Sequence, residues 1–268
     1  MLKQFKICLL ALIPILSFLA GTVRADLTIT PAYVELNLDK GIPSGVFQIS
    51  NRGEEEVRYR VQAVAFRFDT DGGTQLIDPD ERSMARWIVF SPKEFTLGPN
   101  SMQKVRFAVS PRGKLRTGEY WAAMELEALD TLTQKGLDAK GRELSVKVVS
   151  SIVVPIFGKV GTVRYRGMSK EIKVLSEGKG KTIEAWVANV GEGRLFLEGK
   201  YEIVNSSGKV IEDGNLGRSY VLPGGNVKFS VAVKTELETG TYTIKVNYHS
   251  TQLEKPILDE IQFMSKSA

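Results

Sequence analysis

The sequence predicts an all-β protein built from two immunoglobulin-like β-sandwich domains in tandem. After residue 25 the chain reads as short segments of alternating apolar and polar residues, separated by Gly, Pro, Asn and Asp, which is the pattern of strands with one face on a core. The pattern indicates about seven strands between residues 26 and 158, the number in an immunoglobulin-like sandwich. It then restarts, and the length exceeds that of a usual single domain.

Residues 1–25 are predicted to be a signal peptide that is removed on export. Lys3 and Lys6 precede an apolar run from Ile7 to Ala20, and Val23-Arg24-Ala25 closes the segment with a sequence that a signal peptidase reads. The run is too short and wrongly flanked for a lasting membrane span. We expect Asp26 to be the mature N-terminus, with an uncleaved anchor as the alternative.

Charge and cysteine content narrow the function classes. The signal segment holds three of the 36 Lys and Arg residues and none of the 31 Asp and Glu residues, so the rest of the chain has a formal net charge of +2. This weak basicity argues against a general nucleic-acid or anionic-membrane surface. The only cysteine, Cys8, lies in the signal segment, so the mature chain has no disulfide, thiolate nucleophile or cysteine-ligated metal.

The first domain is expected to span 26–160. Apolar residues stand at positions 27 and 29 and then at 34, 36 and 38, and this change of parity at Pro31 predicts an edge strand that passes from one sheet to the other. Strands follow around a turn at 51–53, whose tip at 54–56 is solvated, then across 91–109 and 117–129. Residues 129–143 are predicted to be a long loop, and 144–158 a single, very apolar strand. The second sandwich, 161–268, has strands joined by turns rich in Gly, Asn and Ser.

An enzyme is not predicted. His249 is the only histidine and lies in a predicted strand, and nothing nearby resembles a nucleophile–base pair. The segment 69–73, "DTDGG", resembles the start of a calcium loop, but the bidentate Glu is missing at the required spacing, so a β-turn is favoured. The interleaved Arg and aromatic residues of "RYRVQAVAFRF" are explained by a strand with a basic outer face. We predict no metal and no cofactor.

The strand at 144–158 is the feature that indicates a partner. Leu144, Val146, Val148 and Ile152 share one parity, continued by Val154 and Ile156, and the other parity is largely apolar in its later half. Such a strand is either central and covered on both faces, or apolar on a surface meant for a partner. The residues alone leave both alternatives open.

The chain resembles the periplasmic pilus-assembly chaperones of the PapD-like family. The most specific part is a Pro-x-x-Phe-x-Leu-x-Pro run followed by a Val-Arg strand, and Asn51 and the Tyr120-Trp121 pair also match. The run is carried by Pro92, Phe95, Leu97, Pro99, Val105 and Arg106. The resemblance covers about 26–158 well and the second domain only in architecture.

The resemblance implies that the last strand of the first domain is donated to a client by β-augmentation. The donor residues would be Leu144, Val146, Val148 and Ile152, and Tyr33, Trp121 and Val153 would lie at the client-binding cleft. The family anchors a client's C-terminal carboxylate with two basic residues, and the matching positions here, Tyr33 and Val153, are uncharged.

The sequence therefore predicts a divergent periplasmic chaperone that binds a β-rich, pilin-like exported subunit, with an outer-membrane usher as a second candidate partner, no nucleic acid and no membrane span after signal cleavage. The alternative is a cell-envelope structural or adhesive binding module made of immunoglobulin-like domains.

Overall fold

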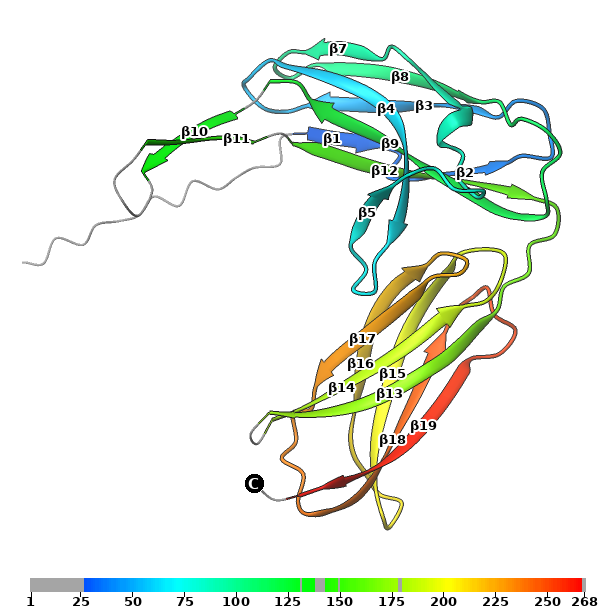
Figure 1. The fold of residues 1–268 in the computed structure, drawn as a ribbon, viewed down its shortest axis with the longest axis vertical. Helices are drawn as coiled ribbons and strands as arrows, with labels where there is room; N and C mark the ends of the chain where they lie inside the picture. The colour runs from blue at the N-terminus through cyan, green and yellow to red at the C-terminus, as the bar shows by residue number, and fades with distance from the viewer. Residues whose placement is uncertain (1–26, 131, 138–142, 149, 178–179, 267–268) are drawn as a thin grey trace, which may run out of the picture.

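The computed structural model describes residues 27–266, apart from 131, 138–142, 149 and 178–179, and describes only the backbone of the strands between 131 and 149. In these ranges the chain forms nineteen strands and one short 3-10 helix, Ala85–Trp87. The strands make two domains that meet at an elbow (Figure 1). No helix in the described part of the chain has the length and apolar character that crossing a bilayer requires. The predicted signal peptide lies outside the described residues.

The first domain is a sandwich of two sheets. One sheet has the order β1-β3-β8-β6, and the other has the order β2-β12-β9-β4-β5, with β7 paired to β4. This is the strand order of an immunoglobulin-like domain whose first strand is shared between the sheets. The strands are β1 Leu27–Thr30, β2 Val34–Asn37, β3 Ser44–Asn51, β4 Val57–Phe68, β5 Thr74–Ile77, β6 Ile88–Ser91, β7 Glu94–Leu97, β8 Met102–Val109, β9 Gly118–Ala128 and β12 Ser151–Val160.

The second domain repeats this architecture with three strands facing four. Its sheets have the orders β13-β14-β17 and β16-β15-β18-β19. The strands are β13 Gly167–Glu177, β14 Gly180–Asn189, β15 Leu195–Asn205, β16 Val210–Val221, β17 Asn226–Ala232, β18 Gly240–His249 and β19 Ile257–Ser265. The predicted all-β fold of two sandwiches in tandem is confirmed.

The crossing of the first strand between sheets is also confirmed. β1 pairs antiparallel with β3, whereas β2 pairs parallel with β12 in the opposite sheet. Pro31 lies between them, and the inward parity changes from residues 27 and 29 to residues 34 and 36. The crossing matters for function because β2 reaches only part of the outer edge of β12.

Each sandwich is held by its own apolar core. In the first domain, alternate residues of β3, β8, β9 and β12 pack together, including Phe47, Val105, Met124 and Ile156. The second core is built in the same way from β14, β15, β17 and β18. Burial of this apolar area is the main stabilising contribution in the described chain, which contains no cysteine.

A buried asparagine recurs at the end of one core strand in each sandwich, β3 in the first and β14 in the second. The side-chain amide of Asn51 donates to the carbonyls of Glu55, Leu97 and Gly98 at 2.7, 3.3 and 3.1 Å. Asn189 donates in the same manner to Gly193 and Val221 at 2.8 and 2.7 Å. In both domains the side chain ties two turns together by donating hydrogen bonds to their backbone carbonyls.

Two predictions for residues 129–158 are wrong. The expected loop at 129–143 contains a strand, β10 (Leu132–Leu137), and the expected single strand at 144–158 is two strands, β11 (Glu143–Val148) and β12. β10 and β11 form a separate antiparallel hairpin, so the first domain has more strands than the seven predicted. The polar sequence of β10 forms a strand because β11 lies beside it, and strand formation depends more on such partners than on intrinsic preference.

Candidate functional site

One edge of β12 is paired over less than half its length. On its inner side β12 pairs with β9 from Ser151 to Val160. On its outer side β2 pairs only with Ile156–Lys159. Among the described residues, no strand pairs with the outer side of 151–155. A row of backbone donors and acceptors without strand partners is the feature to which another chain can add a strand.

The hydrogen bonds of β12 show which residues point to this open edge. The Ala128 amide donates to the Ser150 carbonyl at 2.9 Å, and the Leu38 amide donates to the Lys159 carbonyl at 2.8 Å. Because backbone groups alternate in direction along a strand, even-numbered residues bond to β9 and odd-numbered residues point outward. Ser151 and Val153 therefore offer N–H and C=O groups to the edge, whereas Pro155 offers only a carbonyl.

The β10–β11 hairpin lies between β9 and β12 in the chain. Leu132 pairs with Val148 at its near end and Leu137 with Glu143 at its far end. In Figure 1 the hairpin extends away from the first domain, beyond the ends of β9 and β12. In the described residues β11 pairs with β10 alone. Leu144, Val146 and Val148 occupy alternate positions of β11, and their side chains lie outside the described part of the structure.

Residues 153–157 of β12 are covered on both faces of the strand. Val154 and Ile156 enter the core of the first sandwich, while Phe157 and Val153 lie on the opposite face among Phe66 and Trp121. Ile152, at the start of the strand, is 40% exposed. The alternative of a buried last strand thus holds for Val154 and Ile156, and Ile152 is the predicted partner residue with a described, solvent-facing side chain.

The predicted cleft residues lie in three different environments. Tyr33 directly precedes β2 and is 54% exposed. Trp121 is 5% exposed, and its indole N–H donates to the Phe66 carbonyl at 3.0 Å. It packs in a cluster that includes Leu222 of the second domain, so it contributes to the interdomain contact. Val153 is half-buried at the margin of that cluster, directly beside the open edge.

A buried ion pair joins the two domains, and sequence reasoning missed it. The Arg194 guanidinium bonds to the carboxylates of Glu119 and Glu35 and lies 3.7 Å from the centre of the Phe157 ring. The Arg194 amide also donates to Glu119 at 2.6 Å. Burial raises the pKa of the Glu119 carboxyl, against the lowering effect of Arg194. A Glu in the otherwise apolar start of β9 was the only signal of this pair in the sequence.

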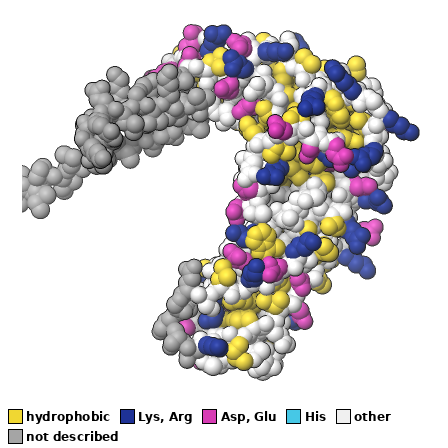
Figure 2. Space-filling model, viewed as in Figure 1, with side chains coloured by type: hydrophobic (Ala, Val, Ile, Leu, Met, Phe, Trp, Pro, Cys, Tyr) yellow, Lys and Arg dark blue, Asp and Glu magenta, His cyan; other side chains and the backbone are white. Residues whose placement is uncertain are grey.

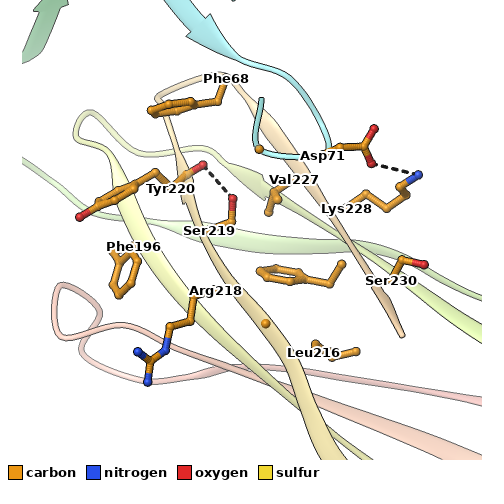
Figure 3. A pocket seen from close by; sticks show the side chains of 13 residues that line it. Phe68, Asp71, Phe196, Leu216, Arg218, Ser219, Tyr220, Val227, Lys228 and Ser230 are labelled. Carbon is orange, nitrogen blue, oxygen red and sulfur yellow. Dashed lines mark hydrogen bonds and ion pairs between the residues drawn. The ribbon is translucent and has the colours of Figure 1, made fainter. Parts of the chain in front are cut away.

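The β4–β5 hairpin makes a second bridge to the second domain. Its tip, the predicted β-turn at 69–73, accepts a backbone hydrogen bond at Thr70 from the Lys228 amide, 2.7 Å long. Lys228 also pairs with Asp71 at 3.1 Å. Figure 3 shows Phe68 and Tyr220 to the left of this contact, and their ring centres are 6.3 Å apart. A cavity of about 490 Å³ lies between the tip and the strands β16 and β17.

Charged side chains of both signs are interspersed over the two domains in the view of Figure 2. No group of three or more potential metal ligands occurs in the part of the chain that the structure describes. His249 is exposed on β18, where its cross-strand neighbour is Glu198.

No protein-family model matches the sequence, and no curated protein matches it. Solved structures do match in fold. One belongs to the CsuC–CsuE chaperone–tip adhesion subunit complex from the archaic Csu pili of Acinetobacter baumannii, with 15% identity and a TM-score of 0.47, covering 88% of this chain and 98% of that one. The YadV chaperone matches with 11% identity and a TM-score of 0.48, covering 89% and 100%.

A third similar structure is a complex of the SafA pilin and the SafB chaperone from Salmonella enterica. The identity is 12% and the TM-score 0.43, and the match covers 88% of this chain and 96% of that one.

Proposed function

We propose that the protein is a periplasmic chaperone for a β-rich exported subunit, which it binds by strand addition along β11 and the open edge of β12. The observation that carries the proposal is this edge, where Ser151 and Val153 direct backbone groups outward and no described strand covers them. An extended segment of a partner can bond to such groups, while alternate side chains set the specificity.

The sequence of β11 supports the same mode of binding. Its alternate apolar residues Leu144, Val146 and Val148 share one face of the strand. A strand that leaves the body of the domain with an apolar face can fill an incomplete apolar groove in a partner. The partner class is that named for the similar structures, a pilin or fimbrial tip subunit. Export through residues 1–25 and a role for an outer-membrane usher belong to the same proposal.

The test is a pair of substitutions on the apolar face of β11, Val146→Glu and Val148→Glu. A carboxylate carried into an apolar groove would be buried without a partner, at a cost on the order of several kcal/mol. Binding should therefore weaken by more than about a hundredfold, because each 1.4 kcal/mol is a factor of about ten. Binding is measured by affinity capture of the exported partner, which mass spectrometry identifies in the wild-type experiment.

Lys147→Glu, on the opposite face of β11, is the matched control and should leave binding within a few-fold of wild type. A circular-dichroism melt of each variant accompanies the binding measurement. Unfolding of the Val146 or Val148 variant would mean that these side chains serve the protein's own core. Undiminished binding by folded variants would contradict the donor role directly.

A further inference from the structure

A carboxylate lies buried beside the open edge without a cation. Glu125 on β9 is 8% exposed. Its Oε2 accepts a hydrogen bond from the Gln62 amide at 2.8 Å, and it forms no ion pair with any described residue. An ionised carboxylate can accept about four hydrogen bonds, and burying one without a counter-charge is costly. Glu125 therefore has unused capacity to bind a positive group.

The arginine of the neighbouring cross-strand pair on this face is already engaged. Arg60 is two residues before Gln62 on β4, so its side chain is on the same face of the sheet. Its guanidinium bonds to Glu94 at 3.2 Å and to Glu127 at 3.5 Å. On the other side of Glu125, its cross-strand partner is Val153 of β12. Glu125 is thus flanked by a neutral amide and a short apolar side chain, and Val153 separates it from the open edge.

Strand geometry places a partner's side chain within reach of Glu125. Neighbouring strands lie about 4.8 Å apart, so a strand added beyond β12 would run about 10 Å from β9. A residue opposite Val153 would project on the same face as Val153 and Glu125. Arg and Lys can lay their aliphatic stems along an apolar surface while the charged head reaches farther. Val153 offers such a surface, with Glu125 behind it.

We infer that Glu125 receives an arginine or lysine side chain of the strand that pairs with the open edge of β12. The inference rests on the proposed function, and it specifies in addition that the pairing strand of the partner carries a basic residue. A partner segment with a basic residue opposite Val153 completes an ion pair across Val153, and one with an acidic residue there is rejected by like-charge repulsion. Glu125 thus distinguishes extended segments by the charge of the residue opposite Val153, whereas the backbone groups of the edge would bind all of them equally.

The test uses synthetic strand peptides as probes. Peptides of alternating Val and Thr carry a terminal fluorophore and one Arg, placed in turn at each central Thr position. A second set carries citrulline, the neutral isostere of Arg, at the same positions. Binding to the wild-type protein is measured by fluorescence anisotropy. In at least one register we expect the Arg peptide to bind about tenfold or more tightly than its citrulline counterpart.

Glu125→Gln should abolish this preference and leave the affinity for the citrulline peptide unchanged. Glu127→Gln, two residues along the same strand face, is the matched control and should keep the preference, because Glu127 already pairs with Arg60. Equal binding of Arg and citrulline peptides to the wild type would overturn the inference and leave the proposed function standing. If no peptide bound, the edge would not accept strands, and the proposed function would fail with the inference.

Discussion

At the residue scale, a single asparagine side chain in each sandwich supplies hydrogen bonds to the backbone carbonyls of two turns. Asn51 and Asn189 occupy equivalent places, each followed two residues later by a glycine whose amide donates back to the asparagine Oδ1 at 2.9 Å. Each side chain thus uses both its donor and its acceptor atoms. Only an amide of this length can do so, because a carboxylate has no N–H and a hydroxyl has one donor.

We predict that Asn51→Asp destabilises the protein by about 2–4 kcal/mol, because it takes the amide donor away from three carbonyls, of which only that of Gly98 keeps the Ser101 hydroxyl as a donor, and faces them with a charge. Urea unfolding followed by tryptophan fluorescence would measure the change. Asn205→Asp is the matched control. Asn205 Oδ1 only accepts hydrogen bonds, from Ser207 and Lys209, so that substitution should cost little. Equal losses in the two variants would contradict the role assigned to Asn51.

At the element scale, the β4–β5 hairpin acts as a strut between the domains. β4 belongs to the first sandwich along most of its length, where it pairs with β9 and β7. Its last residues pair with β5 instead and carry the tip to β17. Phe68 is the last residue of β4, and its contact with Tyr220 supports the tip from the side.

We predict that Phe68→Ala loosens the tip while both sandwiches stay folded. The backbone amide of Lys228, which donates to Thr70, should then exchange with solvent about tenfold faster or more, because local opening becomes easier. Hydrogen exchange followed by NMR measures this rate. Gln75→Ala, on the exposed surface of β5, should leave the rate unchanged. An unaltered Lys228 rate in Phe68→Ala would show that the ring does not support the tip.

At the scale of the whole molecule, the elbow is maintained by a charged contact and an apolar one. Arg194 of the second domain reaches Glu119 and Glu35 on two different strands of the first. Beside it, Leu222 closes the cluster of Phe66, Trp121 and Phe157. Removing one partner of a buried ion pair leaves the other charge uncompensated, which typically costs about 3–5 kcal/mol.

We predict that Arg194→Met lowers the free energy of unfolding by about 3–5 kcal/mol and changes how that free energy varies with pH. Without Arg194 the pKa of Glu119, already raised by burial, rises further. A raised pKa in the folded state gives stability that is present below the unfolded pKa and is lost as pH rises. The deficit of the variant should therefore be larger at pH 8 than at pH 5 in thermal melts.

Arg218→Met provides the control for this experiment. Arg218 pairs with Glu198 at 3.0 Å on the exposed surface, and such pairs contribute less than about 1 kcal/mol. A deficit of Arg194→Met that is no larger than that of Arg218→Met, or that grows toward acidic pH, would contradict a structural ion pair at the elbow.

The sequence by itself determined the all-β class and the crossing of the first strand at Pro31. Both follow from local patterns: a strand has a side-chain period of two, so alternation reports which residues face a core, and a change of parity reports a change of sheet. The predicted partner residues at 144–152 also came from this alternation, and their role stays a prediction.

Only the tertiary structure decided where the edge of β12 is open and what surrounds it. The opening depends on how far β2, more than a hundred residues earlier, extends along β12. The pairing of Glu119 with Arg194 spans 75 residues, and Glu125 became notable only when β4 and β12 were placed on either side of it. Alternation along one strand cannot report such neighbours, because the spacing of about 4.8 Å between strands brings together residues that are unrelated in sequence.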